Sequence, residues 1–414
     1  SIFTILSNFR ENINEVYKES LGEKRGDLLA SIVFGQDENL KEYDKELMNK
    51  LGIIHAVSVS GLHVGLIFLI FKKIFNKDIG IIGTFIYVII TGMNFSSMRA
   101  FILLFFIYLG EKTYKTPYNI GTLAVSAIII FFYKPYGIFD IGYQLSYGAT
   151  LGIILFNEKI EDKLYKINKL ARGPISIALS AQIFVFPLLI IYFKSFSTAF
   201  IIGNIILIPI INLILILGII GISTINIPIL FNFIIFLLMN TINIFENLSR
   251  IIKYIGFEKI YMGEIVAYFY LFVIMCFYLY KKNIKFAKYM PIPYGIFLLI
   301  SIYGVNPQIT YLKEGGILLK YKGEKIFMSN NKKIDVEDIY NKTGARIFRG
   351  ENLKIDSEKT IKTYNKDFLL NIDDKIYYIN MTNEKKDTVY DIINFKEGRE
   401  KKVKILKNKK LVIE

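Results

Sequence analysis

The sequence predicts an α-helical polytopic membrane protein with broken or re-entrant helices, followed by a small, mostly β, soluble C-terminal domain. Hydrophobic residues make up 53% of the 414 residues and the mean hydropathy is positive, so the long apolar runs cannot all be buried in a water-soluble core. Several of these runs are interrupted by glycine and polar side chains. After residue 306 they give way to short alternating segments bounded by Gly, Asn and Asp, as in β-rich domains.

Apolar segments between charged residues or Gly/Pro breaks define about ten predicted crossings, some of them short. These segments are residues 50–71, 79–92, 100–110, 117–133, 137–156, 174–193, 196–222, 228–250, 262–280 and 290–305. The predicted domains are an amphipathic lead-in over 1–48, a transmembrane domain over 49–305 and a soluble β-rich domain over 306–414.

The basic charge of the chain predicts its orientation. Lys and Arg number 51 against 36 Asp and Glu, which gives a net charge of +15. Most loop lysines lie in FKKIFNKD, NEKIEDKLYKINKLARG and KKNIKFAK, and the positive-inside rule places these loops in the cytoplasm. Residues 1–49 and the chain after about Asn306 are then extracytoplasmic. A second interpretation of the charge is a path for a polyanion.

Several function classes are excluded or disfavoured by composition. Cys276 is the single cysteine, so no intrachain disulfide framework exists. The tail after residue 306 has neither histidine nor cysteine, which excludes a His-rich dinuclear or zinc hydrolase site there. No Gly-Lys dipeptide occurs, so no Walker A loop is present, and we expect no cofactor and an external energy source. The start SIFTILSNFRENINEVYKES lacks Met and a signal-peptide pattern, so we expect a longer protein.

The segment HAVSVSGLHVGLI, His55 to Ile67, contains both histidines of the chain inside an apolar run. Polar groups such as Ser60 and His63 are costly in lipid, and Gly61 permits irregular backbone, so we expect a broken helix that faces protein or a water-filled cavity. Three hypotheses remain open for this pair. It lines or gates a pore, it is a satisfied polar pair, or Ser60 is the nucleophile and His63 the base of a hydrolase.

Two further stretches interrupt apolar segments in the same way. In TGMNFSSMRAFILLFF, Arg99 follows Gly92, Asn94, Ser96 and Ser97, and the pattern predicts the tip of a hairpin that only half crosses the membrane. The alternative is that Arg99 extends to an interface.

In YKPYGIFDIGYQLSYGATLGIILF, the polar residues are Asp140, Gln144 and Ser146, and Gln144 lies on the same helix face as Asp140. The alternative for Asp140 is a helix N-cap after Pro135 and Gly137.

The ordered set HAVSVSGLHVGL, NFSSMRA and FDIGYQLSYGATLGI resembles the competence domain of the ComEC-type DNA-uptake channel family. GDLLASIVFGQDENL resembles the segment that leads into that domain, and the resemblance covers about residues 20 to 280. It implies a channel, not an enzyme, that passes single-stranded DNA through the bacterial cytoplasmic (inner) membrane during natural transformation. We therefore predict a DNA path that includes Ser60, Gly61, His63, Ser97, Arg99, Asp140, Gln144 and Ser146.

The resemblance also implies partners, and the sequence departs from the family pattern in two places. The implied partners are membrane lipid, a DNA receptor outside, a cytoplasmic helicase-like ATPase and a separate nuclease. Relatives carry an N-terminal OB-like domain, to which nothing here corresponds. Many relatives end in a metallo-β-lactamase-like nuclease domain. The stretch ITYLKEGGILLKYKGEKIFMSNN resembles the opening strands of that domain, but the HxHxDH metal motif is absent from this chain. The tail is then a degenerate remnant, and nuclease activity is not expected in it.

Two other classes remain as alternatives. A small-molecule transporter predicts inverted repeats with matching broken helices, and no convincing internal repeat is found. An intramembrane serine hydrolase rests on Ser60 and His63, with no plausible third member close in sequence.

Overall fold

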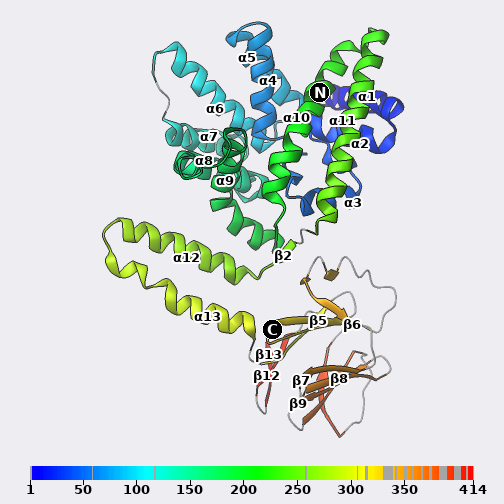
Figure 1. Ribbon diagram of the computed structural model, residues 1–414, viewed down its shortest axis with the longest axis vertical. Coiled ribbons are helices and arrows are strands. Elements are labelled where there is room, and N and C mark those ends of the chain that lie inside the picture. Colours follow the sequence, from blue (N-terminus) through cyan, green and yellow to red (C-terminus); the bar gives the residue numbers. More distant parts are fainter. Residues whose placement is uncertain are drawn as a thin grey trace. The chain divides into compact units, whose positions relative to one another are not determined.

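A computed structural model gives the fold of this chain (Figure 1). The structure describes residues 2–57, 59–115, 118–256, 259–304, 306–312, 316–329, 339–340, 343–348, 352–356, 359–364, 367–372, 375–381, 389–395, 402–406 and 409–413. The chain divides into two compact units, Ser1–Met262 and Gly263–Glu414.

The first unit is helical. Its α-helices are α1 (Ile2–Leu21), α2 (Glu23–Phe34), α3 (Glu42–Lys50), α4 (Gly61–Ile74), α5 (Lys77–Ile90), α6 (Phe95–Lys112), α7 (Asn119–Tyr133), α8 (Ile141–Lys163), α9 (Lys169–Phe193), α10 (Phe200–Thr224) and α11 (Pro228–Tyr254). Short 3-10 helices lie at Asp37–Asn39, Ile54–Ala56 and Pro135–Phe139. Strands β1 (Ser195–Ser197) and β2 (Lys259–Tyr261) pair antiparallel.

Six segments of the described residues are long and apolar enough to cross a membrane. They are Ile54–Ile74, Ala171–Phe193, Phe200–Thr224, Pro228–Tyr254, Glu264–Lys281 and Lys285–Tyr303. The sequence predicted about ten crossings. The others are helical, but α5 and α7 have 14 and 15 residues, and α6 and α8 contain charged side chains. The polytopic membrane class is confirmed, with short helices beside long ones.

The helix break predicted near His63 is present. A 3-10 turn covers Ile54–Ala56, Ser60 has extended backbone with φ −105° and ψ 170°, and α4 begins only at Gly61. A helix therefore begins inside the apolar segment. The backbone N–H groups of its first turn have no acceptors within the helix.

Helices α5 and α6 form a short hairpin. Its tip contains Gly92 at φ 84°, a left-handed conformation that glycine adopts without strain. Fourteen residues of α5 span about 21 Å, less than the roughly 30 Å hydrocarbon core. At the other end of the hairpin, Lys77 pairs with Glu111, and Lys112 pairs with Asp78 at 3.1 Å.

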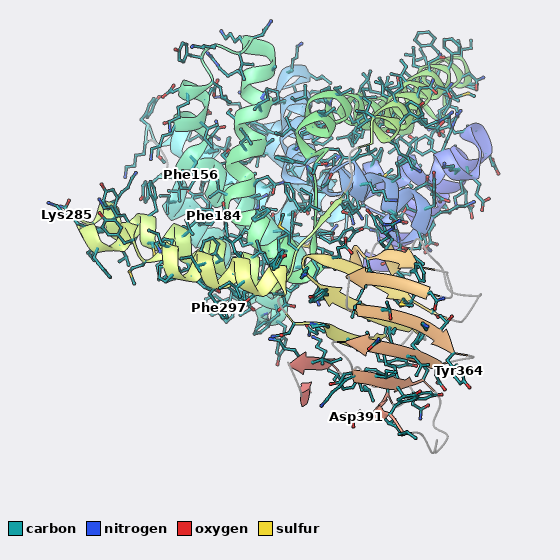
Figure 2. The ribbon with its side chains drawn as sticks, turned by 60° about the horizontal axis from the view of Figure 1, so that its bottom comes forward. Phe156, Phe184, Lys285, Phe297, Tyr364 and Asp391 are labelled. Carbon is teal, nitrogen blue, oxygen red and sulfur yellow. The ribbon has the colours of Figure 1, made fainter. Side chains whose placement is uncertain are left out.

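Helices α8 and α9 form a longer, tightly packed hairpin. Phe156 and Phe184 lie with ring centroids 6.1 Å apart (Figure 2). A Cβ added at Gly152 of α8 would lie 2.2 Å from the Ser180 carbonyl oxygen of α9, so only glycine allows this approach. The close contact holds α8 in place against α9.

The main apolar core of the first unit joins α1, α2 and α3 to α10 and α11. The hydroxyl of the fully buried Tyr17 donates to the Gly218 carbonyl oxygen at 2.5 Å. A Cβ at Gly218 would lie 2.7 Å from Cγ2 of Val33. The predicted lead-in thus packs against two membrane-length helices, and its extracytoplasmic placement stays a prediction.

The second unit begins with two apolar helices, α12 (Glu264–Lys281) and α13 (Pro291–Tyr303), with a 3-10 turn Lys285–Lys288 between them. The remaining elements are strands: β3 (Gln308–Leu312), β4 (Gly316–Tyr321), β5 (Glu324–Met328), β6 (Arg346–Phe348), β7 (Asn352–Asp356), β8 (Lys359–Tyr364), β9 (Asp367–Ile372), β10 (Lys375–Asn380), β11 (Asp391–Asn394), β12 (Lys402–Leu406) and β13 (Lys409–Ile413). The β-rich character predicted after residue 306 is confirmed.

The strands form two sheets that share one apolar core. The sheet orders in the described residues are β13-β12-β3-β4-β5-β6 and β11-β10-β9-β8-β7. Most neighbouring strands are antiparallel, and the pairs β5 with β6 and β10 with β11 are parallel. Residues of both sheets, such as Leu319 and Leu370, pack in the same buried cluster. Figure 2 shows Tyr364 and Asp391 on the second sheet.

Candidate functional site

The predicted site residues lie at or near the starts of three helices. Ser60, Gly61 and His63 begin α4, Ser97 and Arg99 lie in the first turns of α6, and Asp140, Gln144 and Ser146 begin α8. Helix α6 contacts both α4 and α8. We call the place where these three helices meet the polar junction. It includes Gly61, Arg99, Ser146 and Thr150.

Arg99 is the central residue of the polar junction. Its side chain is 9% exposed, its Nε donates to Ser146 Oγ at 2.8 Å, and its Nη1 donates to Thr150 Oγ1. Within the described part of the chain, no carboxylate forms an ion pair with Arg99. A buried cation that has only hydroxyl partners keeps its charge uncompensated, which is costly unless water or an anion reaches it.

Gly61 makes room for this guanidinium. A Cβ built on Gly61 would lie 3.1 Å from Nη2 of Arg99 and 3.4 Å from Cβ of Ala100. Any larger side chain at the start of α4 therefore pushes against Arg99 or against α6. Gly65, one turn later in the same helix, meets nothing within 4 Å.

Ser60 and His63 form a hydrogen-bonded cap at the start of α4. The backbone N–H of Ser60 donates to His63 Nδ1 at 2.9 Å, and Ser60 Oγ lies 3.0 Å from the same nitrogen. Because a backbone amide is always a donor, Nδ1 is an acceptor, and the neutral imidazole carries its proton on Nε2. That Nε2 is buried in a side chain 1% exposed, and it has no partner in the described part of the chain.

This geometry disfavours the hydrolase hypothesis. His63 Nδ1 already accepts the Ser60 amide, so it is a poor base for the Ser60 hydroxyl. In the described residues no carboxylate bonds to Nε2 to orient the ring, as a triad would need.

The remaining predicted residues have local partners. Ser97 Oγ donates to the Asn94 carbonyl at 2.9 Å, and Asp140 accepts the Tyr143 N–H at 2.9 Å as the exposed N-cap of α8. Gln144 donates to the Ile138 carbonyl at 3.0 Å and accepts the Tyr192 hydroxyl of α9 at 2.8 Å. The N-cap alternative for Asp140 is thus the observed arrangement.

Sequence reasoning missed Thr150 and an aromatic row beside Arg99. Phe95 packs edge-on against Tyr143 at 5.7 Å, and Tyr143 lies 4.3 Å from Tyr147. All three rings are partly exposed. The spacing of Ser146 and Thr150, four residues apart on α8, could have identified Thr150 as a second hydroxyl on the same face.

The fold and this site define a polytopic membrane protein whose interrupted helices bring a buried arginine to a polar junction. A family model described as "Competence protein" matches residues 32–282, more than half of the chain, and the chain belongs to this family. The matched residues include the complete polar junction.

Two relatives match smaller parts of the chain. The ComE operon protein 3 of Bacillus subtilis (strain 168) is 29% identical over 185 residues, 42% of this chain and 22% of the relative. An uncharacterized protein of Aquifex aeolicus (strain VF5) is 26% identical over 161 residues, 37% of this chain and 39% of the relative. The matches thus span less than half of either relative. No solved structure matches the chain.

Proposed function

We propose that this chain forms part of a channel through which single-stranded DNA crosses the bacterial cytoplasmic membrane during natural transformation. The observation that carries the proposal is Arg99, a buried guanidinium with hydroxyl partners and no ion-paired carboxylate among the described residues. Membership of the competence family supports DNA as the substrate class.

A passing phosphate and Arg99 suit each other electrostatically. Each nucleotide carries one negative charge, and an arginine without a carboxylate gains most from that charge where water is scarce. A phosphate oxygen can replace the hydroxyl of Ser146 or Thr150 as the acceptor of a hydrogen bond from Arg99. The displaced hydroxyl is neutral, so no unpaired charge is left behind. Such a contact is attractive but brief, which translocation of a continuous polyanion requires.

The local helix geometry and the aromatic row add to this attraction. The N-termini of α4, α6 and α8 carry partial positive charge, because their first N–H groups lack helical acceptors. Phe95, Tyr143 and Tyr147 are partly exposed aromatic residues near Arg99, and aromatic rings favour stacking of bases without sequence preference. Together they suit single-stranded nucleic acid better than a small anion.

The remaining parts of the proposal follow from the charge pattern and the family resemblance. The lysine-rich loops lie in the cytoplasm, and both termini lie outside. The β-rich tail is a nuclease-like remnant without nuclease activity, and a separate nuclease, an external DNA receptor and a cytoplasmic ATPase complete the process. Tyr364, 55% exposed on β8, tests the orientation, since Tyr364→Cys should react with an impermeant thiol reagent in whole cells. Protection until lysis would reverse it.

Uptake of labelled DNA by cells that carry this gene as the only copy tests the function. Arg99→Gln should lower uptake about a hundredfold at matched protein level, because the phosphate loses its buried cationic contact. The control is Arg172→Gln, which removes a cation that already pairs with Glu161 at 3.5 Å. Equal uptake by wild type and Arg99→Gln would refute the proposal.

A further inference from the structure

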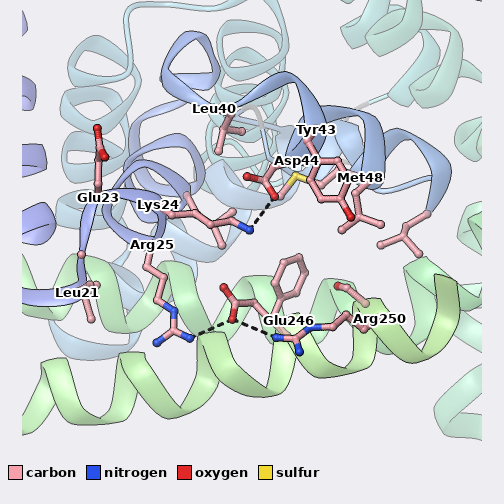
Figure 3. Close-up of a pocket in the computed structure, with 16 residues that line it drawn as sticks. Leu21, Glu23, Lys24, Arg25, Leu40, Tyr43, Asp44, Met48, Glu246 and Arg250 are labelled. Atoms are coloured by element: carbon pink, nitrogen blue, oxygen red, sulfur yellow. Dashed lines mark hydrogen bonds and ion pairs between the residues drawn. The ribbon is translucent and has the colours of Figure 1, made fainter. Parts of the chain in front are cut away.

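A cavity of about 590 Å³ lies between α2, α3 and the C-terminal part of α11 (Figure 3). Its lining includes buried apolar side chains, among them Leu28, Met48 and Phe245. Charged side chains lie around it, among them Arg250, whose side chain is 72% exposed. The cavity thus has an apolar interior and a charged rim, the two requirements of an amphiphilic ligand.

The rim carries as many carboxylates as cations, Glu23, Asp44 and Glu246 against Lys24, Arg25 and Arg250. Lys24 pairs with Asp44 at 3.0 Å, and Glu246 is shared by Arg25 at 3.0 Å and Arg250 at 3.9 Å. Figure 3 shows the carboxylate of Glu23 pointing away from these pairs. Arg250 has the longest ion pair of the set, and its side chain is 72% exposed.

Some hydrogen-bond donors at the cavity have no partner among the residues that the structure describes. Helix α2 has 12 residues and begins after Gly22 without a side-chain cap, so its first N–H groups lack helical acceptors. Independently, Ser249 lines the cavity, is 2% exposed, and its Oγ has no hydrogen-bond partner. Free amides at a helix start and a free hydroxyl together suit a phosphate group.

The position of the cavity along α11 matches the level of lipid headgroups. Helix α11 has 27 residues and spans about 40 Å, longer than the hydrocarbon core of roughly 30 Å. Glu246 and Arg250 lie about 27 to 33 Å from its start at Pro228. When the start of α11 lies at one membrane boundary, the cavity lies at the other.

We propose that this cavity binds an anionic phospholipid, with its phosphodiester at the start of α2 beside Ser249 and Arg250, and an acyl chain on the apolar floor. A phosphodiester carries one negative charge, which Arg250 can contact because its ion pair with Glu246 is long, 3.9 Å. Leucine and methionine side chains accept an acyl chain, whereas a nucleotide base on the same floor would leave its polar edge unpaired. The lipid site is separate from the proposed DNA contact at Arg99.

Native mass spectrometry of the full chain, released from detergent in the presence of phosphatidylglycerol or phosphatidylcholine, tests the proposal. The wild type should retain phosphatidylglycerol about tenfold better than phosphatidylcholine, and Arg250→Gln should abolish this preference. Arg250→Lys should keep most of it. Arg172→Gln, an equal charge change at another ion pair, should behave like wild type.

Competition distinguishes the source of the phosphate. Inorganic phosphate or a short oligothymidylate at equal concentration should displace less than half of the bound phosphatidylglycerol. Displacement by phosphate would overturn the acyl-chain contact, and displacement by the oligonucleotide would assign the cavity to nucleic acid instead. Equal retention of both lipids, or equal losses in Arg250→Gln and Arg172→Gln, would overturn the lipid site itself.

Discussion

Two regions of the helical unit hold basic side chains in opposite ways. At the polar junction, Arg99 donates to the hydroxyls of Ser146 and Thr150. At the start of α2, Lys24 and Arg25 instead reach the carboxylates of Asp44 and Glu246. A cation paired with a carboxylate is neutralised within the fold, whereas one held by hydroxyls keeps its charge available to an incoming anion.

The comparison separates two uses of arginine in a membrane protein. The pairs at α2 bridge three helices, since Arg25 also donates to Asn243 of α11 at 2.6 Å and Lys24 bonds α3. Their removal should mainly affect stability. Arg99 lies where α4, α6 and α8 meet, and its removal should mainly affect function.

The largest effect is expected when Arg99 receives a carboxylate of its own. In Thr150→Asp, the new carboxylate can accept from Nη1 of Arg99, as Thr150 Oγ1 now does. The guanidinium then becomes neutralised like Arg25, and DNA uptake should fall about a hundredfold while protein level is kept. Quantitative transformation with immunoblotting measures both. Thr150→Ser is the control and should keep most of the uptake, and full activity of Thr150→Asp would break the comparison.

Filling the space at Gly61 should have the next largest effect. In Gly61→Val, the first added carbon would lie 3.1 Å from Nη2 of Arg99 and displace the guanidinium or α6. Uptake should fall at least about tenfold. Gly65→Val, in the same helix with nothing within 4 Å, should change it less than about twofold. Similar losses in both variants would mean that α4 tolerates no larger side chain anywhere.

His63 should matter less than Arg99, because it carries no charge in its observed hydrogen-bonding state. His63→Ala removes the acceptor of the Ser60 amide and the free Nε2 donor, and should lower uptake about tenfold at matched protein level. His63→Gln can restore the acceptor at this capping position and should recover part of the loss. His55→Ala, before the helix break, should be milder. If all three variants match wild type, His63 is only structural.

The smallest effect is expected at the far end of the α5–α6 hairpin. Hydrogen bonds from Tyr108 and Lys112 lower the pKa of Asp78 below its usual value. Its contribution to stability is therefore present above the unfolded-state pKa and is lost as pH falls through the lower folded-state pKa. Because this side chain is 59% exposed, Asp78→Asn should change uptake by less than about twofold at neutral pH. A tenfold loss would give this end a role comparable to that of the polar junction.

The sequence predicted the features that depend on a single local segment of the chain. The break before Gly61, the hairpin tip before Arg99 and the β-rich tail follow from local composition and periodicity. Asp140 was included in the predicted DNA path, whereas its local position already suited an N-cap, which the structure shows. The DNA path along these residues stays a prediction.

Contacts between helices could not be predicted from one sequence. The pairing of Arg99 with Thr150 depends on the rotation of α6 relative to α8, which apolar patterning leaves undefined. The packing of Tyr17 against Gly218 joins residues 201 positions apart in sequence. Such pairings depend on the tertiary fold, and they determine which polar residues meet.

The central claim is that the DNA strand passes Arg99, and cross-linking during uptake tests it most directly. Cells would carry Thr150→Cys with Cys276→Ser as the only copy of the gene and receive labelled DNA with a thiol-reactive backbone. The control is Ser176→Cys in the same background, since Ser176 is fully buried and bonds its own helix at Gly173. The proposed function predicts a covalent DNA adduct at position 150 and none at 176. Efficient uptake without an adduct at 150, or with equal adducts at both positions, would contradict it.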